Sequence, residues 1–188
     1  MRVIAGVAGG RRLQAPKGKT ARPTSDRVRE ALFSSLGVEV VGAVVLDLFA
    51  GTGALGIEAL SRGAASATFV ERNAGVATVL TANVESTGLD AQARILRTEA
   101  AGFVRRPTGG PFTLVFCDPP YDEPLPAILD LLSDLNDGGG LASGARVVVE
   151  RDRRDPDLAR KGVGDLLAIE RERSYGDTVL LFYRAKEG

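Results

Sequence analysis

From residue 43 onward, apolar runs of strand length alternate with segments whose apolar residues recur every three or four positions. The short runs predict β-strands, and the periodic segments predict helices. Strands are expected at residues 43–49, 67–71, 94–97, 112–117 and 146–150, and helices at residues 54–62, 73–86, 100–105 and 125–135. Such alternation is typical of parallel βαβ units, so we expect an α/β fold with a doubly wound sheet.

The two ends of the chain depart from this alternation. Residues 166–173 and 178–183 are separated only by a short segment that includes Gly176, which predicts an antiparallel hairpin at the end of the sheet. At the other end, residues 2–13 alternate loosely around Gly9-Gly10, a two-residue turn signal, and predict a small N-terminal β-hairpin. A helix is expected to begin after Thr24 or Ser25 and to end at Gly37.

Composition narrows the chemistry that the chain can perform. With 188 residues, 44% of them hydrophobic, one globular core is expected. The single cysteine, Cys117, excludes an intrachain disulfide and favours a reducing cytoplasm. Histidine is absent, which argues against Ser-His and Cys-His nucleophile pairs and against most zinc sites. We therefore expect no metal. The apolar runs are too short for a membrane helix, so we also expect no membrane association.

Charge is unevenly distributed along a chain whose net charge is zero. Residues 1–36 hold 8 Lys and Arg against 2 Asp and Glu, a sum of +6, and the remaining residues therefore carry −6. A basic N-terminal segment is typical of proteins that contact phosphates, although it is equally typical of a solvated edge that maintains solubility. The candidate phosphate contacts are Arg11, Arg12, Lys17, Lys19, Arg22, Arg27 and Arg29.

A glycine-rich turn follows the first expected strand. Residues 51–56 match the pattern G-x-G-x-x-G, which lets a cofactor approach the backbone, and we expect Gly53 to lie where the backbone meets the ligand. Asp47 precedes the turn and Glu71 ends the next strand, where carboxylates can accept hydrogen bonds from ribose hydroxyls. This arrangement predicts a nucleoside cofactor but does not separate S-adenosylmethionine from NAD, and a tight turn without a ligand remains the simpler alternative.

A second signature, Asp118-Pro119-Pro120-Tyr121, follows the expected strand 112–117. It suits the methylation of a nucleobase amine, because the Asp118 carboxylate and the Pro119 carbonyl can accept its two N–H groups and orient its lone pair. The prolines fix φ at consecutive positions, and Tyr121 offers a ring for the base to stack on. An Asp-Pro turn with a surface tyrosine is the ordinary alternative. We therefore expect Asp118, Pro119, Pro120 and Tyr121 to be the catalytic residues.

Weaker candidates surround these two signatures. Glu99 can meet an adenine amine or simply begin a helix, capping is the favoured role for Asn73, and Cys117 is expected to be a small buried residue. The complete set of expected cofactor contacts is Asp47, Phe49, Gly51, Thr52, Gly53, Glu71, Arg72, Glu99 and Ala100.

Nearly the whole chain resembles the bacterial 16S ribosomal RNA guanine-N2 methyltransferases, the RsmD family. The resemblance rests on residues 2–6 and 10–13, on residues 22–33, on residues 47–59, and on Asp118-Pro119-Pro120-Tyr121. It implies a class I S-adenosylmethionine-dependent methyltransferase (Rossmann-like) fold, with Gly51, Gly53 and Glu71 at the cofactor and the Asp118 motif at the base. Residues 98–100 follow the family pattern only loosely.

The sequence and this resemblance thus predict a cytoplasmic enzyme that methylates the N2 amine of a guanine in small-subunit rRNA with S-adenosylmethionine. We expect a monomer with an RNA-contacting arm at residues 1–24 and a methyltransferase domain at residues 25–188. Three alternatives stay open: a DNA adenine-N6 methyltransferase, because the same motif serves any exocyclic amine on a flipped base; a dinucleotide-dependent oxidoreductase, which the Asp118 motif disfavours; and a noncatalytic nucleic-acid-binding protein of the same fold.

Overall fold

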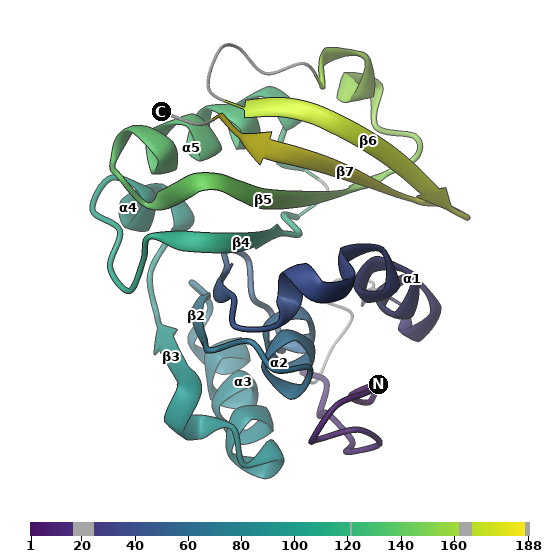
Figure 1. The fold of residues 1–188 in the computed structure, drawn as a ribbon, viewed down its shortest axis with the longest axis vertical. Helices are drawn as coiled ribbons and strands as arrows, with labels where there is room; N and C mark the ends of the chain where they lie inside the picture. Colours follow the sequence, from purple (N-terminus) through teal and green to yellow (C-terminus); the bar gives the residue numbers. More distant parts are fainter. Residues whose placement is uncertain (17–24, 121, 162–166, 187–188) are drawn as a thin grey trace.

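The computed structural model describes residues 1–16, 25–120, 122–161 and 167–186, which form one seven-stranded sheet (Figure 1). The strand order is β3-β2-β1-β4-β5-β7-β6. Strands β1 to β5 run parallel to one another, whereas β7 is antiparallel to both β5 and β6. The strands are β1 (Val44–Asp47), β2 (Ser66–Val70), β3 (Ala93–Leu96), β4 (Phe112–Cys117), β5 (Leu141–Asp152), β6 (Leu167–Tyr175) and β7 (Thr178–Ala185). The predicted parallel sheet with a terminal antiparallel hairpin is confirmed.

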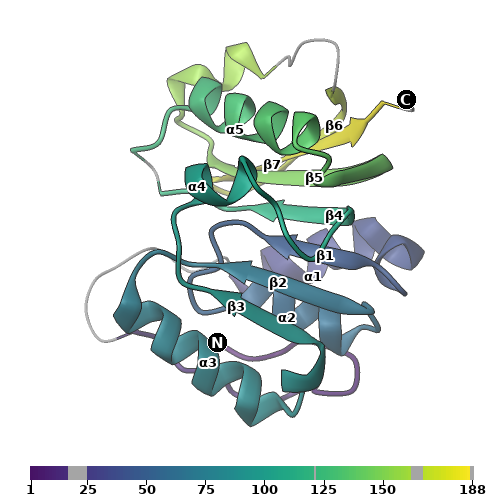
Figure 2. The ribbon, with the colours of Figure 1, turned by 90° about the vertical axis from the view of Figure 1, so that its left-hand side faces the viewer.

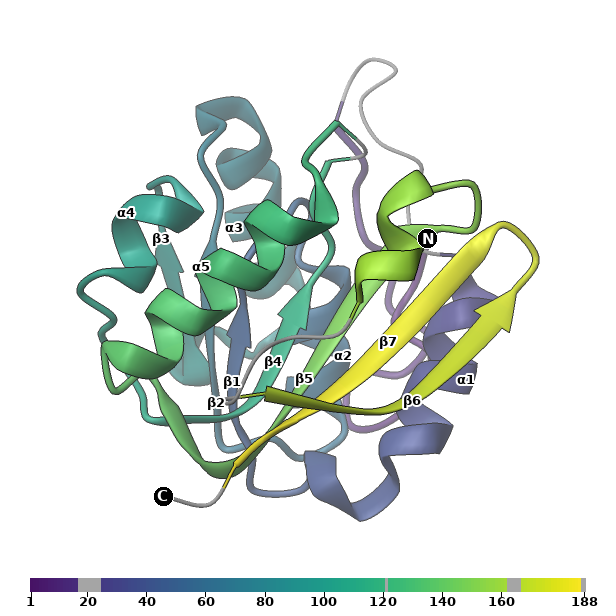
Figure 3. The same ribbon diagram turned by 90° about the horizontal axis from the view of Figure 1, so that it is seen from above.

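Helices cover both faces of this sheet, as Figures 2 and 3 show from two further directions. One face carries α1 (Asp26–Leu36), α2 (Ala54–Ser61) and α3 (Ala74–Thr87), and the other carries α4 (Ala100–Val104) and α5 (Leu125–Asp137). Short 3-10 helices lie at η1 (Gly37–Val40), η2 (Asp90–Gln92) and η3 (Pro156–Arg160). Alternation along β1 sends Val45 into the first core and Leu46 into the second, which is why the strand is buried on both faces.

Two helix starts are fixed by the side chains that the sequence suggested. The Ser25 hydroxyl accepts a hydrogen bond from Val28 N at 3.3 Å and begins α1. Asn73 Oδ1 accepts from Gly75 N at 2.9 Å and from Val76 N at 3.1 Å, so its capping role at α3 is confirmed.

Strand β5 is longer than the pattern predicted, because it begins at Leu141 instead of residue 146. Its pairing with β4 shifts register between Phe112 and Leu114, and Gly144 adopts a φ of 68° within the extra segment. Glycine can adopt a positive φ without strain, so Gly144 allows the strand to continue through the register shift. A glycine just before residue 146 does not itself predict that the strand extends further back.

The N-terminal segment folds back on itself, but its turn is longer than the expected two residues. Arg2 and Arg12 form an isolated antiparallel bridge, and Gly9 N donates to Gly6 O at 3.1 Å within the turn. Gly6 has a φ of 84°, and a Cβ at this position would lie 1.8 Å from the Ser61 carbonyl oxygen. The glycine therefore permits the turn to pack directly against the end of α2.

Candidate active site

The glycine turn and the Asp118 motif leave neighbouring strands at the same edge of the sheet. Strands β1 and β4 pair in parallel with Asp47 opposite Phe116, and Leu48 N donates to Phe116 O at 2.9 Å just beyond β1. The chain continues from β1 to α2 on one face and from β4 to α5 on the other. A crevice between two strands whose connections diverge is where doubly wound sheets bind ligands.

The three glycines of the turn have different roles. A Cβ at Gly53 would lie 2.3 Å from Leu80 Cδ1, and a Cβ at Gly56 would lie 2.2 Å from Phe69 Cε1. Gly51 has a φ of 54° and no atom within 4 Å of the position of a Cβ. The space beside Gly53 is therefore filled by the core, which corrects our expectation that a side chain there would meet the ligand. The open space lies beside Gly51.

The Glu71 carboxylate lies against the same turn. Its Oε2 accepts a hydrogen bond from Gly51 N at 3.1 Å, and its Oε1 accepts from Asn73 N at 2.7 Å. Glu71 directly follows β2, and its side chain is half-buried. It thus borders the open space beside Gly51, in the position where a carboxylate can accept hydrogen bonds from ribose hydroxyls.

Asp47 differs from Glu71 because its carboxylate is buried beneath the turn. Only 1% of the residue is exposed, and its Oδ2 accepts from Gly56 N at 3.0 Å. Burial raises the pKa of Asp47 to about 7; the Gly56 hydrogen bond opposes this shift, and the nearby Glu71 charge adds to it. The expected ribose contact of Asp47 is therefore corrected: this side chain supports the start of α2 from inside the protein.

The other expected cofactor residues follow the carboxyl ends of strands β1, β2 and β3. Phe49 and Thr52 are half-buried, and Arg72 is exposed. Glu99 is exposed at the N-cap position of α4, where its side chain makes no capping hydrogen bond, and Ala100 is the first residue of that helix. These residues share one edge of the sheet, so their cofactor contacts stay a prediction that the topology permits.

On the base side, Asp118 is half-buried, Pro119 is buried and Pro120 is exposed. Pro120 O accepts from Glu123 N at 3.1 Å, which closes a turn after the prolines. Tyr121 lies outside the described residues. Cys117 is buried, and burial raises the pKa of its thiol, so the interpretation as a small core residue is confirmed.

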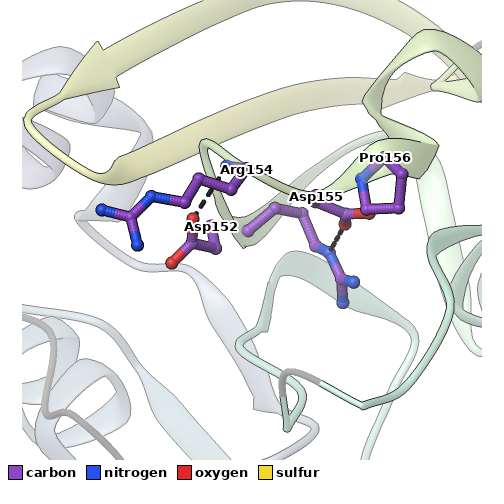
Figure 4. A pocket seen from close by; sticks show the side chains of 5 residues that line it. Asp152, Arg154, Asp155 and Pro156 are labelled. Carbon is purple, nitrogen blue, oxygen red and sulfur yellow. Dashed lines mark hydrogen bonds and ion pairs between the residues drawn. The ribbon is translucent and has the colours of Figure 1, made fainter.

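An open pocket of about 270 Å³ lies at the carboxyl end of β5, the strand next to β4 (Figure 4). Arg151 Nε donates to Asp155 Oδ2 at 2.5 Å, and Arg154 N donates to Asp152 Oδ1 at 2.8 Å. Pro156 completes the lining. No sequence motif marks this pocket, although residues 151–155 are all charged, with both signs present.

The expected RNA contacts separate into three groups. Arg11, Arg12 and Arg27 are exposed. Arg29 is completely buried, and its guanidinium donates to Asp26 Oδ1 at 3.0 Å and to the Arg2 carbonyl oxygen. Its assignment as an RNA contact is wrong, because no surface is left for a phosphate to reach; the helical pattern places position 29 beside the core. The remaining three expected contacts, Lys17, Lys19 and Arg22, lie outside the described residues.

Two buried side chains of α2 that the sequence did not single out hold the N-terminal segment. Glu58 Oε2 accepts from Ile4 N at 2.7 Å, and its Oε1 accepts from Ala5 N at 3.1 Å. Ser61 Oγ accepts from Ala8 N at 2.9 Å. Polar residues at buried positions of a helix were the signal for these contacts. The segment is therefore fixed to the helix that begins at the glycine turn.

Within the described part of the chain, no group of three or more acidic, cysteine or histidine side chains is arranged to hold a metal ion. Across the same residues, we find no helix with the length and apolar character that crossing a bilayer requires.

The sheet order, the helices on both faces and the glycine turn define a protein with the class I methyltransferase fold. Residues 1–184 match the family model described as Conserved hypothetical protein 95. The chain is 42% identical over 150 residues to ribosomal RNA small subunit methyltransferase D of Escherichia coli K12, covering 80% of this chain and 74% of that protein. It therefore belongs to the family of ribosomal RNA small subunit methyltransferase D.

Two further comparisons extend over the whole chain. YlbH of Bacillus subtilis is 38% identical over 191 residues, which cover 99% of this chain and 100% of that protein. The solved structure of yhhF from Escherichia coli superposes with a TM-score of 0.86 at 36% identity and covers 100% of this chain and 99% of the other. The N-terminal segment is thus part of the shared structure.

Proposed function

We propose that this protein transfers a methyl group from S-adenosylmethionine to the exocyclic N2 amine of a guanine in 16S rRNA. The observation that carries the proposal is the adjacency of the glycine turn after β1 and Asp118-Pro119-Pro120 after β4, at the carboxyl ends of two paired strands whose connections diverge. The membership in a family of rRNA methyltransferases supports the RNA substrate.

The residues around the glycine turn fit S-adenosylmethionine. Gly51 provides open space at the backbone, and the Glu71 carboxylate borders that space, as a ribose with two free hydroxyls requires. Phe49 and Thr52 on the turn, with Arg72, Glu99 and Ala100 at the neighbouring strand ends, would complete the contacts. The cofactor supplies an activated methyl group, so the protein needs no strong base and the absence of histidine is no obstacle.

On the base side, the protein's task is to orient a weak nucleophile. The lone pair of an exocyclic amine is delocalised into the ring, and hydrogen bonds from its two N–H groups to the Asp118 carboxylate and the Pro119 carbonyl favour a pyramidal nitrogen. Pro119 and Pro120 restrict the backbone that carries these acceptors, so little reorganisation is needed. Tyr121 is proposed to stack on the base. Positioning, and not proton abstraction, then accounts for most of the rate.

The open pocket at the carboxyl end of β5 supports our proposal that the base is guanine and not adenine. The Watson–Crick edge of guanine presents N1–H and N2–H donors next to the O6 acceptor, whereas adenine presents a single amine and no carbonyl. In the pocket lining, Asp152 offers a carboxylate and Arg154 offers a guanidinium group, whereas the nearly buried side chains of Arg151 and Asp155 pair with each other. This mixture of acceptors and donors is complementary to the edge of guanine.

We further propose that residues 1–24 act as an arm that holds RNA while residues 25–188 form the catalytic domain. Arg11, Arg12 and Arg27 are exposed and available to phosphates. The arm is anchored to α2 through Glu58 and Ser61, so RNA bound to it would be held on the cofactor side of the sheet.

The decisive experiment supplies labelled S-adenosylmethionine with unmodified 16S rRNA, assembled small subunits, or DNA in separate reactions. We expect label in one of the two ribosomal substrates and, after digestion to nucleosides, recovery as N2-methylguanosine. Label on the N6 amine of DNA adenine would overturn the proposal in favour of a DNA methyltransferase. Binding of RNA without transfer to any substrate would favour a noncatalytic role.

A further inference from the structure

A buried amide on α3 bonds to both the N-terminal segment and the glycine turn. Asn83 is completely buried. Its Oδ1 accepts from Gln14 N at 2.7 Å, and its Nδ2 donates to Gln14 O at 3.1 Å and to Thr52 O at 2.9 Å. One side chain thus connects two segments that lie 69 and 31 residues away from it along the chain.

These two segments have different proposed ligands, because the glycine turn is proposed to bind the cofactor and the N-terminal segment to bind RNA. Thr52 lies between Gly51 and Gly53 in the turn that borders the cofactor space, and Gln14 lies three residues before Lys17 in the basic segment. Asn83 uses both of its N–H groups for the two carbonyls, so a displacement of either backbone changes the hydrogen bond to the other. Burial excludes water as a substitute partner, which makes the connection sensitive to such displacement.

Each segment also has anchors of its own. The N-terminal segment is held by Glu58 and Ser61, and the turn is held by the bond from Gly51 N to Glu71. Neither segment therefore depends on Asn83 alone for its fold. What Asn83 adds is a direct connection between them.

We infer that Asn83 is a positioning residue that couples RNA binding at the arm to cofactor binding at the glycine turn. RNA that immobilises the arm fixes Gln14, and the Asn83 amide then holds the Thr52 carbonyl in the conformation that the cofactor requires. Binding of one ligand thereby lowers the entropic cost of ordering the site for the other. By thermodynamic linkage, RNA and cofactor must strengthen each other's binding by the same factor. This inference rests on the proposed function, because it assumes that the same protein binds RNA and S-adenosylmethionine.

Two substitutions interrupt the connection from opposite sides. Asn83→Leu replaces the amide with an apolar side chain of similar size and removes every bond of the connection. Gln14→Pro removes only the N–H that donates to Asn83 Oδ1, and it leaves α3 and the bond from Asn83 Nδ2 to Gln14 O in place. Thr87→Val is the matched control, because Thr87 is buried on the same helix and its hydroxyl bonds only within that helix among the described contacts, to Val84 O at 2.7 Å.

The test measures the affinity for S-adenosylhomocysteine by calorimetry, without RNA and with saturating unmodified 16S rRNA. We expect RNA to tighten binding by about 5-fold or more in the wild type, within the usual range of coupling between sites. The ratio should fall toward one in Asn83→Leu, fall part of the way toward one in Gln14→Pro, and stay unchanged in Thr87→Val. Thermal unfolding verifies that each variant is folded, and if Asn83→Leu does not fold, Gln14→Pro carries the test.

The outcomes separate this inference from the proposed function. A wild-type protein that binds both ligands with a ratio of one, or folded variants that retain the wild-type ratio, would overturn the coupling alone. A wild-type protein that binds neither S-adenosylhomocysteine nor RNA would overturn the proposed function and the coupling together.

Discussion

The Asp47 carboxylate accepts a hydrogen bond from the backbone N–H of Gly56 at 3.0 Å and thereby joins the end of β1 to the first turn of α2. Both groups are buried, and the bond spans the glycine turn from beneath. The turn is consequently held on its inner side by Asp47 and on its outer side by Glu71. This arrangement explains why two acids at neighbouring strand ends have different consequences for stability and for binding.

Asp47 should make the stability of the protein depend on pH. Its pKa is about 7 in the folded state and near 3.8 in the unfolded chain, so the folded state retains a proton that the unfolded state releases between these values. The contribution of Asp47 to stability is therefore fully present below about pH 4, falls as the pH rises to about 7, and is constant above that. The slope of one such group reaches at most about 1.4 kcal/mol per pH unit.

Urea unfolding of the wild type and Asp47→Asn between pH 4.5 and 8 measures this contribution. The uncharged variant lacks the titration, so its stability relative to the wild type should improve steadily up to about pH 7. A difference between the two proteins that is independent of pH would contradict the assignment.

Substitutions at Gly53 and Gly51 should have different effects. Gly53→Val places atoms against Leu80 and strains a backbone with a φ of 83°, so we expect a loss of stability of about 1 to 3 kcal/mol. Gly51→Ala meets no neighbouring atom and costs about 1 kcal/mol for its positive φ, but its methyl group enters the space proposed for the cofactor. Melting temperatures and S-adenosylhomocysteine affinities of both variants distinguish the two roles. Unaltered affinity in Gly51→Ala would argue against a ligand beside that residue.

Asp118→Ala should lose most methyl transfer while retaining cofactor affinity. Removing one preorganised acceptor costs ~2 to 4 kcal/mol of barrier, which corresponds to roughly a 30- to 900-fold loss of turnover. Asp122→Ala removes an exposed carboxylate four residues further along and serves as the control. Turnover in Asp118→Ala that equals the control would show that Asp118 does not orient the amine.

The order of strands and helices was predictable because each segment carries its own period, and two of the helices, α1 and α3, also carry a side-chain cap. Strand β4 coincides with the apolar run that was expected to form it, and Ser25 and Asn73 cap the helices that follow them. These signals are local, since they depend on a residue and its neighbours within a few positions. The predicted parallel topology brings both motifs to one edge of the sheet, but the pairing of β1 with β4 became known only from the structure.

Other features depend on contacts that no local pattern contains. The burial of Arg29 results from packing beside the N-terminal segment, and the role of Gly53 results from Leu80, which lies on a different helix. Asn83 is connected to Gln14 across 69 residues, so only its polar character at a buried position of α3 could have marked it. Sequence patterns identify which residues carry chemistry more readily than they identify which residues hold them in place.

The last prediction concerns the basic segment at residues 1–36, whose formal charge is +6. Each phosphate contact releases counterions, so the logarithm of RNA affinity should fall with the logarithm of salt concentration by about 0.7 to 0.9 per contact. The test variant changes Arg11, Arg12, Lys17 and Lys19 to Ala. We expect weaker RNA binding and a flatter salt slope, while S-adenosylhomocysteine affinity measured without RNA is preserved because the glycine turn is unchanged.

The control for this variant changes Arg105 and Arg106 to Ala. Both arginines are exposed at the end of α4, on the face of the sheet opposite the arm. Their substitution therefore removes positive charge without altering the proposed RNA surface. RNA binding across a salt series is measured for all three proteins. If the arm holds phosphates, the slope changes in the arm variant and not in the control. Equal slopes and affinities in the arm variant and the wild type would mean that the arm is only a solvated edge, and that RNA lies against another surface.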